Sequence, residues 1–371
     1  MFRTTCAICV GVLNPIYKIE QMPINLSCVD SSSNYRFAPL SFSQCLECNT
    51  IQLDNLIDPK ILYETSHNYT SMGKVWELYF QTMTRVIESI VDKKTVLEIG
   101  CPSGKLARKL DCYNKWYIVE PNKNESIEFN DKIVFIESFF NNDVIIHDNI
   151  DVIVHSHVFE HIYEPRHFLK KCHEILADGG EMVFGVPNME YLTEQSLCLF
   201  AGIFFEHTIF LNKQNISYLL KENGFELIEI IDYENHSTIY RAKKTCLTHS
   251  SPIIPIIDYQ SVFFDLIHRY EEFIENCNNI IQNTKKEVYI FGASYNTQIL
   301  LSIGIHCHKI NGILDNCMDK HRKYLYGSSL MITSPDEIVG KDCIVILKNG
   351  YYVSEIRDQL LELNPNVTIL Q

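Results

Sequence analysis

The chain has 371 residues and a formal net charge of −14, with 46 acidic residues against 32 lysines and arginines. This balance, without a dense basic stripe, argues against a nucleic-acid binder, because phosphate backbones are neutralised by clustered lysine and arginine. No apolar run approaches the roughly 18 residues that cross a membrane, and no signal-peptide core opens the chain. We therefore expect a cytoplasmic protein of about two or three domains that binds neither membrane nor nucleic acid.

Two C-x-x-C pairs lie near the start of the chain: Cys6 with Cys9, and Cys45 with Cys48. Each pair can place two thiolates on one tetrahedral zinc ion, and four cysteines leave no open position for catalysis. A thioredoxin-like redox role is disfavoured because neither pair opens a βαβ unit. We predict a structural Zn²⁺ that folds an N-terminal module over residues 1–60.

The next segment changes to a helical pattern. Apolar residues recur at three- and four-residue steps from position 75 to position 90, which predicts an amphipathic helix. Just before it, Tyr63, His67, Tyr69 and Ser71 cluster in a predicted loop, where aromatic side chains most often simply pack.

Residues 95–107 read TVLEIGCPSGKLA, which predicts a strand, a tight turn and a helix. Gly100 and Gly104 suit a turn where the backbone approaches a ligand, and the following helix offers free N–H groups. The turn is no phosphate loop, and Pro102 replaces the middle glycine of a dinucleotide fingerprint. A second predicted strand ends at Glu120, where a carboxylate can bind a ribose diol.

Further strands are predicted at residues 133–136, 151–154 and 181–188, with a helix that starts at Glu164-Pro165 and stops at Asp178. The fourth strand runs into His155, His157, Glu160 and His161. His157 and His161 could share a helix face, but Glu160 is not placed as in the His-Glu-x-x-His zinc motif.

These segments together resemble the class I S-adenosylmethionine (SAM) methyltransferases. That family has an acidic strand end followed by Gly-x-Gly-x-Gly, a second strand ending in a carboxylate, a segment like 155–161 after the fourth strand, and a Gly-Gly turn before a strand ending in Val-Pro-Asn. The resemblance implies that SAM binds at the turn, that residues 137–140 hold its adenine, and that segment 155–161 contacts the cofactor and a helix, not zinc. The implied cofactor-binding residues are Glu98, Gly100, Cys101, Gly104, Glu120, Ser138, Phe139 and His157.

Glu206 and His207 follow the fifth strand and can form an acid/base station, since a neutral imidazole accepts a proton near pH 7 and a carboxylate can orient it. The alternative is a histidine that only caps or packs a helix.

The last third of the chain predicts a linking helix at residues 259–281, then a strand and turn over 286–294, a strand over 311–316 that ends in acid, a strand at 343–347, a helix and a final strand at 367–370. The second of these strands ends at Asp315. These elements predict a second, smaller α/β domain with the same order of strand, turn and acidic strand end as the first. It is either a remnant duplication with a packing role or a domain that helps to bind a nucleotide-bearing substrate.

Over nearly the whole chain, this order resembles the three-domain sugar C-methyltransferases, which act on nucleotide-linked deoxy-keto-sugars. The division is a zinc module at 1–60, a SAM-dependent methyltransferase domain at 61–245, and a linking helix with a Rossmann-like tail at 246–371. The resemblance implies that His207 is the catalytic base and that Glu206 supports it. It also implies that Tyr69 belongs to the active-site loop and that the tail helps hold the nucleotide.

Two departures from that family keep other functions open. Phe204 stands where the family has a tyrosine, and Ser237 and Thr238 replace two glycines that let the substrate approach. Methylation of a sugar oxygen or nitrogen is one alternative, and a noncatalytic zinc-stapled scaffold with a degenerate SAM fold is another. The acidic charge disfavours protein or RNA methylation, and the sequence does not indicate an oligomeric state.

Overall fold

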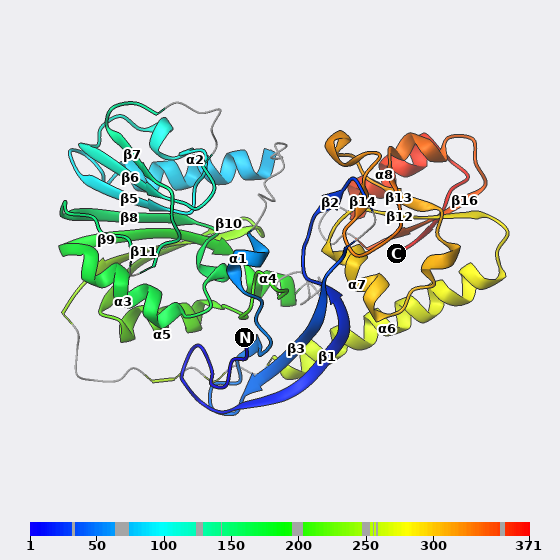
Figure 1. Cartoon of the computed structure of the whole chain (residues 1–371), viewed down its shortest axis with the longest axis horizontal. Coiled ribbons are helices and arrows are strands. Elements are labelled where there is room, and N and C mark those ends of the chain that lie inside the picture. The colour runs from blue at the N-terminus through cyan, green and yellow to red at the C-terminus, as the bar shows by residue number, and fades with distance from the viewer. Residues whose placement is uncertain are drawn as a thin grey trace.

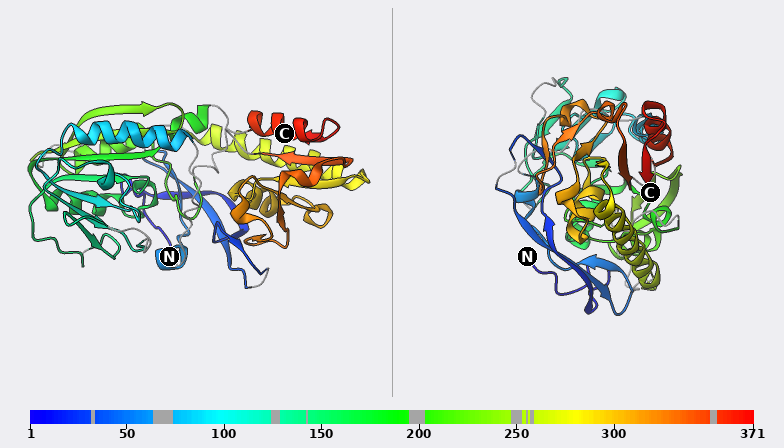
Figure 2. Two further views of the ribbon diagram at one scale, coloured as in Figure 1. Left: turned by 90° about the horizontal axis from the view of Figure 1, so that it is seen from above. Right: turned by 90° about the vertical axis from the view of Figure 1, so that its right-hand side faces the viewer.

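The computed structural model describes residues 1–31, 34–63, 74–123, 129–141, 143–194, 203–246, 253–254, 256, 259–348 and 353–371. Two lobes, each built on its own sheet, lie at opposite ends of the long axis (Figure 1 and Figure 2). A long N-terminal hairpin and helix α6 (Gln260–Asn283) run between them. The predicted α/β class, with a second smaller α/β unit, is confirmed.

The N-terminal segment forms a three-stranded antiparallel sheet in the order β1-β3-β4. Its strands are β1 (Leu13–Pro23), β3 (Phe37–Cys45) and β4 (Ile51–Leu53). Phe42 of β3 is fully buried, with its ring 5.1 Å from that of Phe263 on α6. The short strand β2 (Cys28–Val29) pairs with β14 (Tyr324–Leu325) of the tail. The hairpin therefore shares its apolar core with the C-terminal lobe.

The larger lobe contains a seven-stranded sheet in the order β10-β11-β9-β8-β5-β6-β7. The strands from β5 to β9 run parallel to their neighbours, and β11 is inserted antiparallel between β9 and β10. Parallel strands bring their carboxyl ends to one edge, where α/β folds bind ligands. The strands are β5 (Thr95–Ile99), β6 (Lys115–Val119), β7 (Ile133–Ile136), β8 (Ile150–Ser156), β9 (Leu176–Pro187), β10 (Phe225–Tyr233) and β11 (Ser237–Lys244).

The helices of this lobe begin at residues suited to capping. Asp58 accepts a hydrogen bond from the Lys60 amide at the start of α1, and Asn212 accepts one from the Asn215 amide at the start of α5. The predicted amphipathic helix is α2, with Tyr79 fully buried. The helices are α1 (Pro59–Leu62), α2 (Lys74–Glu88), α3 (Pro165–Ile175), α4 (Met189–Glu194) and α5 (Lys213–Glu222), with 3-10 turns η1 (Ala107–Lys109) and η2 (Phe159–His161).

The helix predicted directly after Gly104 is wrong, because only the 3-10 turn η1 forms there. The residues from 105 to 114 must return the chain to Lys115, where β6 begins, and that distance leaves room for little more than one turn. The predicted stop of α3 at Asp178 also lies too late, since the helix ends at Ile175 and β9 starts at Leu176.

The smaller lobe contains a five-stranded parallel sheet in the order β15-β13-β12-β16-β17. The structure confirms the predicted linking helix, α6, and the strands predicted for the sheet of this lobe. Within the described residues, no helix has both the length and the apolar character needed to cross a bilayer. The remaining elements are β12 (Glu287–Phe291), α7 (Tyr295–Ile303), β13 (Gly312–Leu314), β15 (Ile332–Thr333), β16 (Cys343–Leu347), α8 (Val353–Leu363) and β17 (Thr368–Leu370), with 3-10 turns η4 (Cys307–Lys309), η5 (Met318–Lys320) and η6 (Pro335–Ile338).

Candidate active site

The glycine turn after β5 has a left-handed backbone at both glycines, with φ of 76° at Gly100 and 56° at Gly104. A Cβ atom on Gly100 would lie 2.4 Å from Val158 Cγ2, and one on Gly104 would lie 2.7 Å from Phe129 Cε1. Glycine is therefore required here by the packing of the chain itself, in addition to any ligand.

Glu98 points into the protein. Its side chain is 1% exposed, and Trp116 Nε1 donates to its Oε2 at 2.8 Å. Burial raises the pKa of Glu98 to about 7. Cys101 is also turned inward, since its Sγ accepts the Lys105 amide at 3.3 Å and burial raises the pKa of its thiol. Both residues shape the turn from behind.

Glu120 lies at the carboxyl end of β6 and remains able to accept more hydrogen bonds. Among the described residues, its side chain accepts one hydrogen bond, from the Asn122 amide to Oε1 at 2.8 Å. Burial raises its pKa to about 6. The Ser138 amide donates to the Glu120 carbonyl at 3.3 Å, which brings Ser138 and Phe139 to the same edge. Three of the predicted SAM-binding residues thus lie together.

A row of side chains continues from this edge to the predicted base. The Tyr63 ring lies 6.5 Å from that of Phe139, and its hydroxyl is 2.7 Å from His161 Nδ1. His161 Nε2 is in turn 3.2 Å from His207 Nε2, and its Nδ1 is 3.9 Å from Glu206 Oε2. Burial raises the pKa of Tyr63, so its phenol stays protonated. The row joins the edge that holds Glu120 to the predicted acid/base pair.

Strand β4 of the N-terminal module fixes the segment that carries His207. The Leu53 amide donates to the Thr208 carbonyl at 2.8 Å, and the Phe210 amide donates to the Ile51 carbonyl at 3.0 Å. The buried guanidinium of Arg3 donates to the Thr208 carbonyl and hydroxyl at 3.3 and 3.2 Å. The residue next to His207 is therefore held by the module that carries the cysteines.

The four predicted zinc ligands form one cluster, with their Sγ atoms within 4.8 Å of one another. Cys6 and Cys48 are 3.6 Å apart, and Cys9 and Cys45 are 3.4 Å apart. Tetrahedral zinc with Zn–S bonds of about 2.3 Å separates its sulfurs by just under 4 Å, so the donor set fits. Gln52 Nε2 also donates to Cys6 Sγ at 3.2 Å, as expected around a thiolate ligand.

His157 has both ring nitrogens engaged within the protein. Its Nε2 is 2.9 Å from Ser237 Oγ and its Nδ1 is 3.1 Å from Glu160 Oε1. Its backbone has a φ of 53°, which places the ring against Trp76 and Tyr79. Any contact of His157 with the cofactor would have to use its backbone or ring face.

The departures at Ser237 and Thr238 serve internal contacts. Ser237 Oγ lies 2.7 Å from His236 Nδ1, in addition to its contact with His157. Thr238 Oγ1 donates to Asp232 Oδ1 at 2.9 Å. Both are buried in β11.

The tail reaches the site through Phe204. The rings of Phe204 and Tyr295, the first residue of α7, stack at 5.4 Å with an angle of 5°. Phe204 also lies 4.4 Å from the His207 ring. The second lobe therefore contacts the residue next to the predicted base.

The sequence interpretation missed part of this site. Tyr69 lies outside the described residues, whereas Tyr63, taken as a packing aromatic, contacts His161. His161 and His207 are 46 positions apart, so no local pattern could pair them. The only sequence signal was that both follow parallel strands, whose carboxyl ends share an edge.

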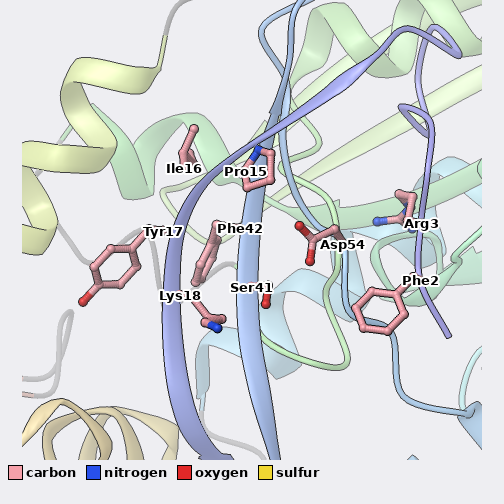
Figure 3. Close-up of a pocket in the computed structure, with 9 residues that line it drawn as sticks. All are labelled: Phe2, Arg3, Pro15, Ile16, Tyr17, Lys18, Ser41, Phe42 and Asp54. Atoms are coloured by element: carbon pink, nitrogen blue, oxygen red, sulfur yellow. The ribbon is translucent and has the colours of Figure 1, made fainter.

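A hollow of about 510 Å³ lies elsewhere, on the N-terminal module. Figure 3 shows Phe2 and Asp54 on one side of it and Tyr17 on the other, across the strands of the hairpin. It contains none of the predicted cofactor-binding or catalytic residues, and we assign it no role in catalysis.

Residues 73–230 match the family model described as a methyltransferase domain. This match includes strands β5 to β9 and part of β10, and it ends before β11. The glycine turn, Glu120, His161 and His207 all lie within it. This part of the chain is a SAM-dependent methyltransferase domain with a class I, Rossmann-like core.

Several solved structures are similar to this core. The N-methyltransferase NodS from Bradyrhizobium japonicum WM9 is 16% identical over 46% of this chain and 97% of its own, with a TM-score of 0.37. Its complex with S-adenosyl-L-homocysteine is 14% identical over 46% and 88%, at 0.36. A SAM-dependent methyltransferase from Mesorhizobium loti is 11% identical over 46% and 99%, at 0.38. No curated protein matches the chain.

Proposed function

We propose that this methyltransferase transfers a methyl group from SAM to a nucleotide-linked deoxy- or keto-sugar, at carbon, with His207 as the base. One observation carries the proposal: Tyr63, His161 and His207 form a continuous polar row that starts at the edge of Glu120 and Phe139. The row ends where the tail contacts Phe204. A substrate with a nucleotide at one end and a sugar at the other suits a site that lies between two lobes.

The residues present fit SAM. Glu120 can accept hydrogen bonds from ribose hydroxyls, Ser138 and Phe139 can hold the adenine, and the glycine turn can approach the rest of the molecule. When bound, SAM supplies an electrophilic methyl group. Alignment of the acceptor beside it would supply much of the rate.

His207 would take the proton from the acceptor. Its imidazole lies 3.2 Å from His161, and Tyr63 bonds the far side of His161, so the pair is held in fixed orientation. Glu206 adds a carboxylate near the pair, with its Oε2 3.9 Å from His161 Nδ1. Proton transfer of this kind contributes on the order of 10²- to 10⁴-fold.

Incubation with SAM and a panel of nucleotide sugars, followed by mass spectrometry, tests the substrate class. A gain of one methyl group supports the proposal, and fragmentation then separates carbon from oxygen or nitrogen methylation. His207→Ala should lower turnover by about 10²- to 10⁴-fold with SAM affinity unchanged. His308→Ala, an exposed histidine in the tail, is the matched control. A loss smaller than tenfold for His207→Ala would refute the base assignment.

We also propose that the cysteine cluster holds a structural Zn²⁺. Four thiolates close the coordination sphere, so the ion would stabilise the module and not take part in the reaction. Reduced thiols of this kind are maintained in the cytoplasm, where we place the protein.

A further inference from the structure

A second group of metal-ligating atoms lies in the row described above. Glu160, His161 and His207 each offer one ligand atom, and these atoms lie within 4.8 Å of one another. The facing Nε2 atoms of His161 and His207 are 3.2 Å apart, which matches two adjacent ligands on one ion at bond lengths of about 2.1 Å. Glu160 and His161 come from turn η2, whereas His207 follows the fifth parallel strand, so only the fold brings them together.

The state of Glu160 is an independent observation that indicates a ligand. The residue is 3% exposed, and its Oε2 accepts no hydrogen bond from the residues that the structure describes. The other carboxylate oxygen, Oε1, lies 3.1 Å from His157 Nδ1. A buried carboxylate is costly unless it is paired or coordinates a metal. Two histidines and one carboxylate are a common donor set for divalent transition metals with open coordination positions.

Neighbouring side chains hold His161 and Glu160 in the way that is typical around metal ligands. The ring nitrogen of His161 that faces away from His207 is 2.7 Å from the Tyr63 hydroxyl. Metal-binding histidines typically use their second nitrogen in this way, which fixes the orientation of the ring. His157 stands behind Glu160 in the same manner.

We propose that Glu160, His161 and His207 form a binding site for a divalent transition metal, distinct from the cysteine cluster. The donor set of two nitrogens and one oxygen suits Zn²⁺, Fe²⁺, Co²⁺ or Mn²⁺. The cysteine cluster is closed, whereas this site has three protein ligands and leaves positions for water or substrate.

The site has a consequence that rests on the proposed function. A neutral imidazole has a single lone pair, so His207 cannot bind a metal and accept a proton at the same time. Metal loading of this site should therefore suppress methyl transfer, and chelation should restore it while the cysteine cluster stays intact.

Metal counting on the full-length protein tests the site without using turnover. Protein loaded with Co²⁺ and freed of loosely bound metal should contain one ion with thiolate charge-transfer absorption and a second ion without it. Glu160→Gln, which preserves side-chain volume, and His161→Ala should each lose the second ion and keep the first. Circular dichroism and the retained thiolate band would show that both variants are folded.

The control is His308→Ala, which removes the exposed member of a pair with half-buried His306, whose rings lie 5.6 Å apart. This variant should keep both ions. The proposal is overturned if the wild type binds only the thiolate-bound ion, or if the second ion is lost in His308→Ala and kept in Glu160→Gln. A protein that binds the second metal but still methylates no sugar after that ion has been removed by chelation would leave the site standing and reject the proposed substrate.

Discussion

The two parallel sheets carry the same sequence signature, a glycine turn after one strand and an acidic residue at the end of the next, but their carboxylates are in different states. Glu120, in the larger lobe, accepts one hydrogen bond among the described residues. Asp315, in the tail, accepts three, from the amides of Ala293 and Cys317 and from Lys320 Nζ at 3.1 Å. The first carboxylate therefore has more capacity for ligand hydroxyls than the second.

This difference separates a carboxylate that could bind a ligand from one that closes a turn. Lys320 neutralises Asp315 and also donates to the Ala293 carbonyl at 3.1 Å, so the carboxylate closes the turn after β12. The corresponding turn in the larger lobe has no such lysine among the described contacts of Glu120. A glycine turn and a strand-end acid therefore do not by themselves indicate a nucleotide site, and the tail's contribution to substrate binding is better sought at Tyr295.

The largest effect should come from breaking the closed turn of the tail. Asp315→Ala removes the partner of a mostly buried lysine and should destabilise the tail by about 3 kcal/mol, since half of a buried pair is costly to leave behind. Hydrogen exchange of the β12 and β13 amides would measure this loss locally. SAM affinity should not change, and a parallel loss of SAM binding would show that the two lobes are not independent in this respect.

Removing the open carboxylate should give the opposite result. Glu120→Ala should weaken SAM binding about a hundredfold, because two hydrogen bonds to a charged acceptor contribute about 1.5–3 kcal/mol each in buried sites, part of which is offset by desolvation. Calorimetry with SAM measures the effect. Glu120→Gln keeps the shape of the side chain without its charge, so its SAM affinity should lie between those of the wild type and Glu120→Ala. An unchanged affinity in both variants would show that Glu120 does not bind SAM.

The pH dependence of SAM binding sharpens the comparison. Burial raises the pKa of Glu120 to about 6, so without SAM its protonated form stabilises the fold at low pH and that contribution is lost as pH rises through about 6. Ribose hydroxyls favour the charged form, so SAM affinity should be constant well above pH 6 and fall about tenfold per unit below it. Titrations of Glu120→Gln should lack this slope, and any slope that persists there would be assigned to Glu98, whose pKa is raised to about 7.

The smallest effect concerns the contact between the lobes. Phe204→Leu removes the stack on Tyr295 and should cost about 1 kcal/mol, as expected for one aromatic pair. Chemical denaturation of both forms measures it. Phe204→Tyr keeps the stack, so its free energy of unfolding should equal that of the wild type. A similar loss of stability in both variants would show that the loss in Phe204→Leu cannot be assigned to stacking.

Local patterns predicted the strands well because alternating and continuous apolar runs depend on neighbouring residues. They wrongly predicted a helix after Gly104. There the structure is decided by the number of residues available before β6, and helix propensity does not decide it. The pairing of Asp315 with Lys320 was equally hidden, since Lys320 lies on a 3-10 turn with no sequence signature. The row of Tyr63, His161 and His207 depends on three distant segments, and the reach of the N-terminal hairpin into the tail depends on the whole fold.

The pairing of β2 with β14 has a consequence for how the chain is made. Cys28 must wait for Leu325 before its backbone finds a partner, so most of the polypeptide leaves the ribosome first. Until then the buried face of the hairpin, with Leu40 and Phe42, lacks part of its cover. During synthesis, the first strands are therefore complete for a long interval while part of their apolar face stays exposed. Chaperones that bind apolar β-strands would be expected to bind the nascent chain during that interval.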